Sequence, residues 1–172
     1  MKTLWQNTGS DAGTTMATWA AETMVAAGLH GDGLYVATAS AGGQESVEFL
    51  RDGLATGLAF ANPRLFPWSL ANSPTGAIAR ALGVRGPTYT LLGAADAVAA
   101  AFEHAAEDLA DGVVRRPLVV ALDADEERWS LAAVAFEGGP LPVLPVDRTA
   151  AGALGRLVET TTRDGAGRSG YS

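Results

Sequence analysis

The chain has 172 residues, with 19 acidic and 12 basic side chains, a formal net charge of −7 and a pI near 4.7. This acidic balance disfavours a nucleic-acid surface, and the absence of cysteine excludes disulfides and thiolate metal sites. The first ten residues have no apolar signal core and no apolar run is long enough to cross a bilayer, so neither secretion nor a membrane span is indicated. The length fits one domain, and we expect a cytoplasmic protein.

Strands and helices are predicted to alternate along most of the chain. Apolar, β-branched and aromatic runs predict five strands, at residues 2–6, 34–39, 88–92, 118–122 and 131–136. Alanine-rich or helically spaced apolar segments predict three helices between the strands, at residues 14–27, 44–54 and 94–110. The order βαβαβαββ predicts an α/β fold with a mixed, mostly parallel five-stranded sheet and helices on both faces.

The most informative segment joins the third predicted strand to the third predicted helix. Gly86 and Pro87 are typical of a turn before the strand, and Gly93 allows a sharp turn after it. The run N-x-x-x-G-x-I-A-x-x-L-G-x-R-G-P-T-x-T, which spans residues 72–90, resembles the segment before the active-site elbow of β-ketoacyl synthases. The likeness extends more weakly over residues 34–137.

The elbow itself lacks the residue on which that family's chemistry depends. In ketosynthases the strand ends in a T-A-C type sequence, and its cysteine takes the acyl chain as a thioester. Laid on this chain, the three positions fall on Gly93, Ala94 and Ala95. The resemblance therefore implies that Ala95 stands where the nucleophile would be, and a methyl group cannot act as a nucleophile.

A ketosynthase is a duplicated thiolase-type fold, and its two catalytic histidines lie in the second half. The present length suffices for one such half, so the resemblance implies a ketosynthase-like N-terminal half-domain over residues 1–146. Residues 147–172 are expected to form a short helix, at 149–158, and a flexible tail. His30 and His104 match no histidine motif of the family, and we interpret both as surface or structurally satisfied side chains.

Few other side chains suggest a site. Asp96 follows Ala95 at the predicted helix start, and we interpret it as a capping carboxylate; a general acid or base is the alternative, which would need a raised pKa. A second group is expected to line an acyl pocket or an interface, with core packing as the alternative for its aromatic members. It comprises Phe66, Trp68, Thr88, Tyr89, Thr90 and Leu92.

Two further patterns carry weaker chemical signals. Ser40 and Ser46 lie near a glycine turn, but no G-x-S-x-G elbow supports hydrolase chemistry. An acidic cluster after the fourth predicted strand suits a solvated loop better than a hard-cation site, although oxygen ligands would fit magnesium or calcium. The cluster comprises Asp123, Asp125, Glu126 and Glu127. We predict no metal and no cofactor.

The resemblance implies a non-catalytic accessory or scaffold protein of type II polyketide or fatty-acid biosynthesis. It is similar to chain-length factors, the cysteine-less partners of ketosynthases, although those keep both halves. Alternatives are an enzyme that hydrolyses, dehydrates or cyclises an acyl thioester, or an acyl-binding module.

Association is expected for two reasons. Ketosynthases pair through the strand before the elbow, here residues 88–92, and a lone half would leave the alanine-rich face of the helix at 94–110 in water. We therefore predict a homodimer, or a heterodimer with a ketosynthase or chain-length-factor subunit, with acyl carrier protein as a further candidate partner. In the alternative, the first helix or the tail folds back and covers that face.

Overall fold

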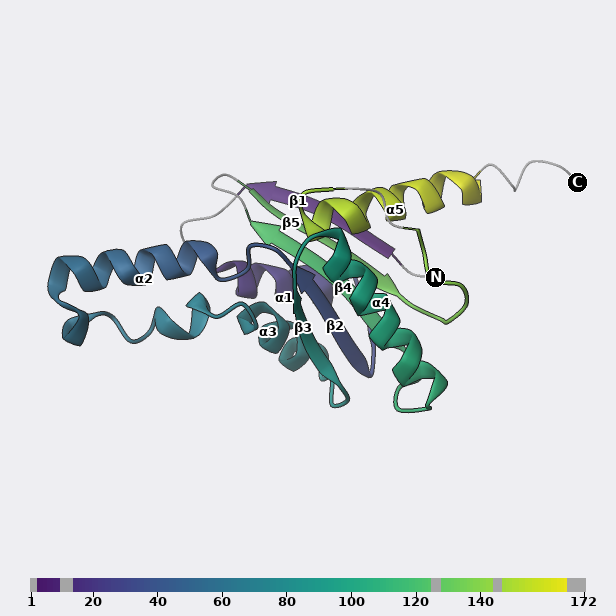
Figure 1. Cartoon of the computed structure of the whole chain (residues 1–172), viewed down its shortest axis with the longest axis horizontal. Coiled ribbons are helices and arrows are strands. Elements are labelled where there is room, and N and C mark those ends of the chain that lie inside the picture. Colours follow the sequence, from purple (N-terminus) through teal and green to yellow (C-terminus); the bar gives the residue numbers. More distant parts are fainter. Residues whose placement is uncertain (1–2, 10–13, 125–127, 144–146, 167–172) are drawn as a thin grey trace, which may run out of the picture.

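The computed structural model describes residues 3–9, 14–124, 128–143 and 147–166 (Figure 1). The strands are β1 (Thr3–Gly9), β2 (Gly33–Thr38), β3 (Thr88–Leu92), β4 (Pro117–Ala124) and β5 (Arg128–Ala135). The α-helices are α1 (Met16–Ala26), α2 (Gly43–Thr56), α3 (Ser73–Leu82), α4 (Ala95–Ala110) and α5 (Ala150–Ala166). Two short 3₁₀ helices, η1 (Leu58–Phe60) and η2 (Phe66–Ser69), lie between α2 and α3.

The five strands form one mixed sheet in the order β1-β5-β4-β2-β3. Strands β2, β3 and β4 are mutually parallel, whereas β5 runs antiparallel to both β4 and β1. Four strands therefore point the same way and β5 alone is reversed. The predicted α/β class and the mostly parallel five-stranded sheet are confirmed.

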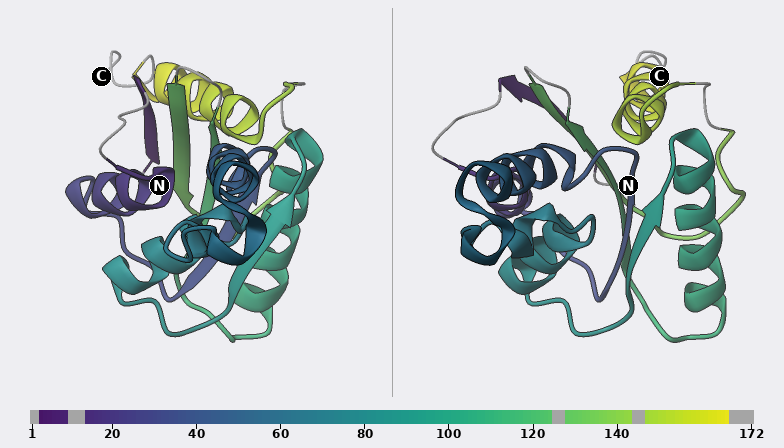
Figure 2. Two further views of the ribbon diagram at one scale, coloured as in Figure 1. Left: turned by 90° about the vertical axis from the view of Figure 1, so that its left-hand side faces the viewer. Right: turned by 60° about the vertical axis from the view of Figure 1, so that its left-hand side comes forward.

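Alternating side chains of the central strands build two separate cores. Leu34 and Val36 of β2 point to one face, where they pack with α1 and α3, while Tyr35 and Ala37 point to the other face. The second face is covered by α4 and α5, so helices flank the sheet on both sides (Figure 2). Both faces of β2 and β4 are buried, which explains why these strands read as continuous apolar runs.

The alanine-rich side of α4 is covered, so the expectation that it lies open to water is wrong. Helix α5 packs beside α4, and Leu154 and Val158 join Val98 and Phe102 in the same core cluster. The alternative, in which the tail folds back, describes this contact correctly. The physical reason is that α5 offers apolar side chains at helical spacing, and it reaches Ala166 instead of ending at 158.

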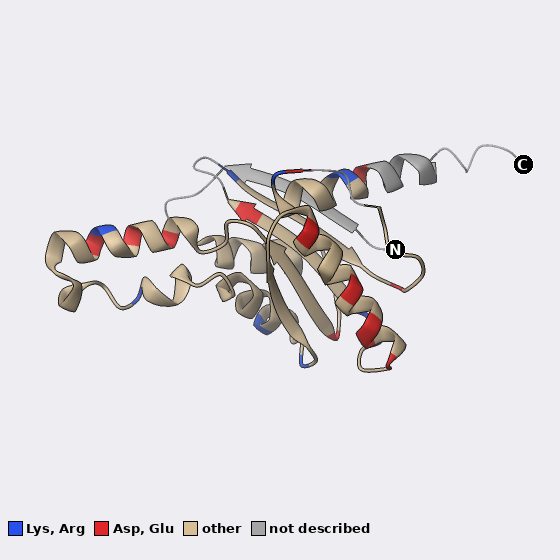
Figure 3. Cartoon of the chain, viewed as in Figure 1, with Lys and Arg blue, Asp and Glu red and all other residues tan. Residues whose placement is uncertain are grey.

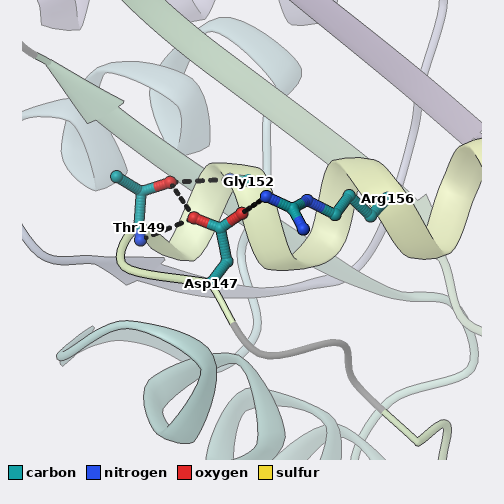
Figure 4. A network of polar contacts seen from close by, with 4 residues as sticks. All are labelled: Asp147, Thr149, Gly152 and Arg156. Carbon is teal, nitrogen blue, oxygen red and sulfur yellow. Dashed lines mark hydrogen bonds and ion pairs between the residues drawn. The ribbon is translucent and has the colours of Figure 1, made fainter.

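A network of polar side chains fixes where α5 begins (Figure 4). Thr149 Oγ1 accepts a hydrogen bond from the N–H of Gly152 at 3.0 Å, the geometry of an N-cap. The carboxylate of Asp147 accepts from the Thr149 N–H at 3.0 Å and pairs with the Arg156 guanidinium at 2.7 Å. Burial acts to raise the pKa of Asp147, but the Thr149 donors and Arg156 outweigh it, so this pKa is lowered.

Asp147→Asn is expected to lower the free energy of unfolding by about 1 kcal/mol at neutral pH, because one charge-assisted contact at the cap is lost. A lowered folded-state pKa stabilises the protein above the unfolded value of 3.8, and this contribution is lost as the pH falls through the folded-state pKa. The difference in the free energy of unfolding between wild type and variant should therefore become smaller in acid. Urea unfolding at two pH values measures this difference. A difference that does not change with pH would contradict the lowered pKa of Asp147.

Helix α2 and the two 3₁₀ helices form an arm, residues 43–69, that projects from the body of the sheet (Figure 1). Within α2 the one buried residue is Gly53, and several large apolar side chains of the arm are exposed. They are Val47, Leu50, Leu54, Leu58, Phe60 and Phe66. The arm contacts itself through α2, η1 and η2 and leads into α3. None of the described helices is long and apolar enough to cross a membrane.

Candidate functional site

The site begins where β3 turns into α4. Gly93 has a φ of +149°, and a Cβ there would come within 2.8 Å of the Asp96 carboxylate, so both backbone and space favour glycine. Its N–H donates to the Thr38 carbonyl at 3.0 Å, which ties the turn to β2. Ala95 is the first residue of α4. A strand, a glycine turn and a helix follow one another here, with a half-buried methyl group at the first helical position.

Neither Asp96 nor either histidine is placed as a buried acid or base beside Ala95. Asp96 lies in the first turn of α4 but is exposed, and no side-chain capping bond is present at the helix start. His104 lies nine residues further along α4, about 13 Å from Ala95 along the helix axis. His30 precedes β2 and so lies at the opposite end of the parallel strands. Neither histidine can take a proton from a group at Ala95.

Asp123 is a buried carboxylate near the carboxyl end of β4. This is the same end of the parallel strands at which β3 turns into α4. Its Oδ1 accepts from the N–H groups of Ala39 and Ser40, at 2.6 and 3.1 Å, and from the Ser40 hydroxyl at 3.1 Å. Its Oδ2 accepts from the N–H of Ala151 at 2.9 Å. Burial raises the pKa of Asp123, against the opposing effect of the Ala151, Ala39 and Ser40 donors.

These bonds give Asp123 a structural role. Both carboxylate oxygens are occupied by donors from the β2–α2 turn and from the first turn of α5, so the side chain joins three segments. Ser40 is equally engaged, because its hydroxyl also accepts from the N–H of Ala124 at 2.7 Å. Among the described residues, every buried side-chain nitrogen or oxygen has a partner.

The acidic cluster predicted after β4 is only partly within the described residues. Asp125, Glu126 and Glu127 lie outside them, and Asp123 points into the network above. In the described part of the chain, no group of three or more histidine or acidic residues is placed to hold a metal ion. Ser46, the other serine considered, donates to the Ser69 carbonyl and links α2 to η2.

The six predicted pocket or interface residues fall into different surroundings. Phe66 is 52% exposed on the arm and packs edge-on against Phe49. Trp68 lines an open groove of about 490 Å³ between α1 and α3. Thr88, Thr90 and Leu92 line a second groove, of about 550 Å³, between β3 and the start of α3. The set therefore describes an arm and a strand edge, not a single enclosed pocket.

Tyr89 belongs to a cluster that sequence reasoning missed. Its ring stacks on Tyr35 and on His104, each at 5.5 Å between ring centres. Tyr35 is fully buried and its hydroxyl donates to Asp108 Oδ2 at 2.6 Å, so burial and this carboxylate raise the pKa of Tyr35 well above its usual value. His104 also pairs with Glu107 at 3.5 Å. The cluster links β2, β3 and α4 at the edge of the sheet.

No protein-family model and no curated protein matches the chain. Solved structures similar to it include the ishigamide ketosynthase/chain length factor, with a TM-score of 0.49 and 18% identity over 64% of this chain. A tetronic acid condensing enzyme has a TM-score of 0.41 and 19% identity over 76% of this chain. The chain spans 37% and 39% of the lengths of these two proteins. At these scores the likeness does not by itself assign an activity.

Proposed function

We propose that the protein is a non-catalytic, ketosynthase-like subunit that associates with another protein through β3, in polyketide or fatty-acid assembly. The observation that carries the proposal is the elbow: its strand, glycine turn and helix are built as in an enzyme, but Ala95 offers no nucleophile. The run at residues 72–90 supplies the resemblance to ketosynthases. The partner is a second copy or a ketosynthase-type subunit.

The edge of the sheet supports association. Strand β3 is the last strand on its side, and within the described residues no other strand pairs with its outer edge. Tyr89 and Leu92 on this strand are 40% and 69% exposed. An exposed strand edge with apolar side chains is a template for pairing with another chain. An edge of this kind directly before an inactive elbow fits a pairing subunit better than a free-standing enzyme.

Ala95→Cys tests the non-catalytic assignment. The new thiol would lie at the N-terminus of α4, where the helix dipole lowers a thiol pKa, so alkylation should be roughly tenfold faster than for Ala110→Cys at the other end of the helix. Wild type contains no cysteine, so mass spectrometry sees only the introduced thiol. We expect a reactive thiol without acyl transfer, because neither His30 nor His104 lies close enough to take its proton.

The contradicting result is equally measurable. If Ala95→Cys accepts an acyl group from a carrier protein and passes it to a second substrate, the chain retains condensing machinery and an accessory role alone is wrong. Equal alkylation of the two cysteine variants would instead mean that position 95 does not lie at an activating helix terminus.

A further inference from the structure

A further pocket lies at the amino ends of β2 and β4, the end of the sheet away from the elbow. Its volume is about 380 Å³, and three basic side chains line it. They are His30 from the turn between α1 and β2, and Arg115 and Arg116 from the segment before β4. The two arginines are the only consecutive basic residues in the sequence. None of the described residues that line this pocket belongs to the elbow or to β3.

Backbone contacts hold the basic segment in place. The Asp32 carboxylate accepts from the N–H groups of Arg115 and Arg116, at 2.9 and 2.8 Å, and the Asp32 N–H donates to the Arg116 carbonyl at 3.1 Å. Gly31 lies so close to this segment that a Cβ there would come within 2.7 Å of the Arg116 carbonyl oxygen. These contacts join the two segments by their backbones and keep His30 at the same pocket as the arginines.

The end of β5 supplies the third wall of the pocket. The Phe136 N–H donates to the Pro117 carbonyl at 3.0 Å, which ties this end to the start of β4. The apolar residues that line the pocket are buried, since Leu29, Ala135 and Phe136 are 1%, 8% and 6% exposed. Apolar walls lower the local dielectric constant, so a charged ligand interacts more strongly with the basic groups than it would in water.

The pocket gathers positive charge in an acidic protein. Acidic positions extend along α2 and α4, and α4 contains neither lysine nor arginine (Figure 3). Within the described chain, neither Arg115 nor Arg116 forms an ion pair with a carboxylate. Asp32 does not line the pocket and directs its carboxylate to the two backbone N–H groups. Glu137 does line it, so the two arginines and this acid give a formal charge of about +1, which protonation of His30 would raise by one.

We propose that this pocket binds a small phosphate monoester, with Arg115 and Arg116 on the phosphate oxygens and the organic part of the ligand against Phe136. The planar guanidinium group offers paired N–H donors that match phosphate oxygens, and the His30 ring supplies a further donor. A phosphate monoester carries close to two negative charges at neutral pH. The pocket volume lies near the lower end of the range of about 300–1,000 Å³ for small-molecule sites, so the ligand must be small.

Isothermal titration calorimetry with phenyl phosphate tests the proposal. Inorganic phosphate shows whether the anion alone is recognised, and phenol shows whether the apolar walls bind without it. The variant Arg115→Gln/Arg116→Gln removes both guanidinium groups from the pocket. The matched control is Arg51→Gln/Arg64→Gln, which removes the same charge from exposed positions on the arm. Circular dichroism checks that both double variants fold as wild type does.

Wild type should bind phenyl phosphate roughly tenfold more tightly than it binds phenol, and roughly tenfold more tightly than Arg115→Gln/Arg116→Gln binds phenyl phosphate. The control variant should stay within about twofold of wild type. Glu137→Gln should tighten binding by roughly threefold, because it removes a like charge from the pocket, and unfolding cannot produce such a gain.

Absence of binding to phenyl phosphate, or equal affinity of the two double variants for it, would overturn the inference. Inorganic phosphate bound as tightly as phenyl phosphate would overturn the assignment to a monoester, since the apolar walls would then contribute nothing. Each of these outcomes leaves the proposed pairing through β3 unaffected, because the pocket lies away from that edge.

Discussion

Asp123→Ala should lower the free energy of unfolding by about 3 kcal/mol, the largest effect that we expect from a single substitution. The change leaves the N–H groups of Ala39, Ser40 and Ala151 without their acceptor, and Ala151 is fully buried, so water does not replace the lost bond there. The same loss frees the β2–α2 turn from the start of α5. Because domains are stable by about 5–15 kcal/mol, a variant of this kind approaches the limit of folding.

Urea unfolding followed by circular dichroism measures this effect. Asp111→Ala is the matched control, since it removes an exposed acid at the end of α4 and should change stability by less than about 0.5 kcal/mol. If the two variants unfold at the same urea concentration, Asp123 does not hold the three segments together.

The pH dependence of Asp123 has the opposite sign to that of Asp147. Because burial raises the folded-state pKa of Asp123 above its unfolded value of 3.8, folding favours the protonated form. Its contribution is therefore complete below 3.8 and is lost as the pH rises through the folded-state pKa. Asp123→Asn removes this dependence, so wild type should gain stability relative to the variant as the pH falls. If wild type instead lost stability relative to Asp123→Asn as the pH falls, the folded protein would prefer the ionised carboxylate.

Leu92→Pro should weaken association through β3 by roughly a hundredfold. The N–H of residue 92 points outward, so proline removes a donor from the open edge without breaking a bond to β2. The proline ring also occupies the space of an incoming strand. Leu92→Thr is the control, since it keeps the donor and the strand propensity while shortening the exposed side chain.

Sedimentation of each variant, mixed with the partner that wild type binds, measures the change. Both variants should unfold within a few degrees of wild type, because Leu92 is 69% exposed. A proline variant that associates as well as wild type would move the interface away from β3, for example to the exposed side chains of the arm.

The order of strands and helices around the elbow could be predicted because the signals there are local. β3 has its predicted bounds, 88–92, and α4 begins one residue after its predicted start because Gly93 and the alanine run mark the turn and the helix. Helix α3 was missed, since Pro74 and Gly76 are typical of a loop. Proline is nevertheless tolerated in the first helical turn, and Gly83, at a φ of +68°, ends the helix.

What could not be predicted depends on contacts between distant segments. Tyr35 meets Tyr89 because the two residues are register partners in neighbouring strands, and only the pairing of β2 with β3 reveals this. Asp123 was assigned to an acidic loop, yet it lies within a buried strand, one residue before its end, beside the backbone donors of two other segments. That α5 covers α4 could not be predicted either, because no local sequence pattern shows where α5 packs against the sheet.

The solution mass of the chain, by light scattering after gel filtration, tests the central claim most directly. It should be measured for the chain alone and after mixing with any ketosynthase-type subunit that is encoded beside it. The account predicts a mixed complex whose mass is the sum of the two partners, and which Leu92→Pro prevents. A chain that remains a monomer in both measurements would contradict a role in pairing and would mean that the open edge of β3 has no partner.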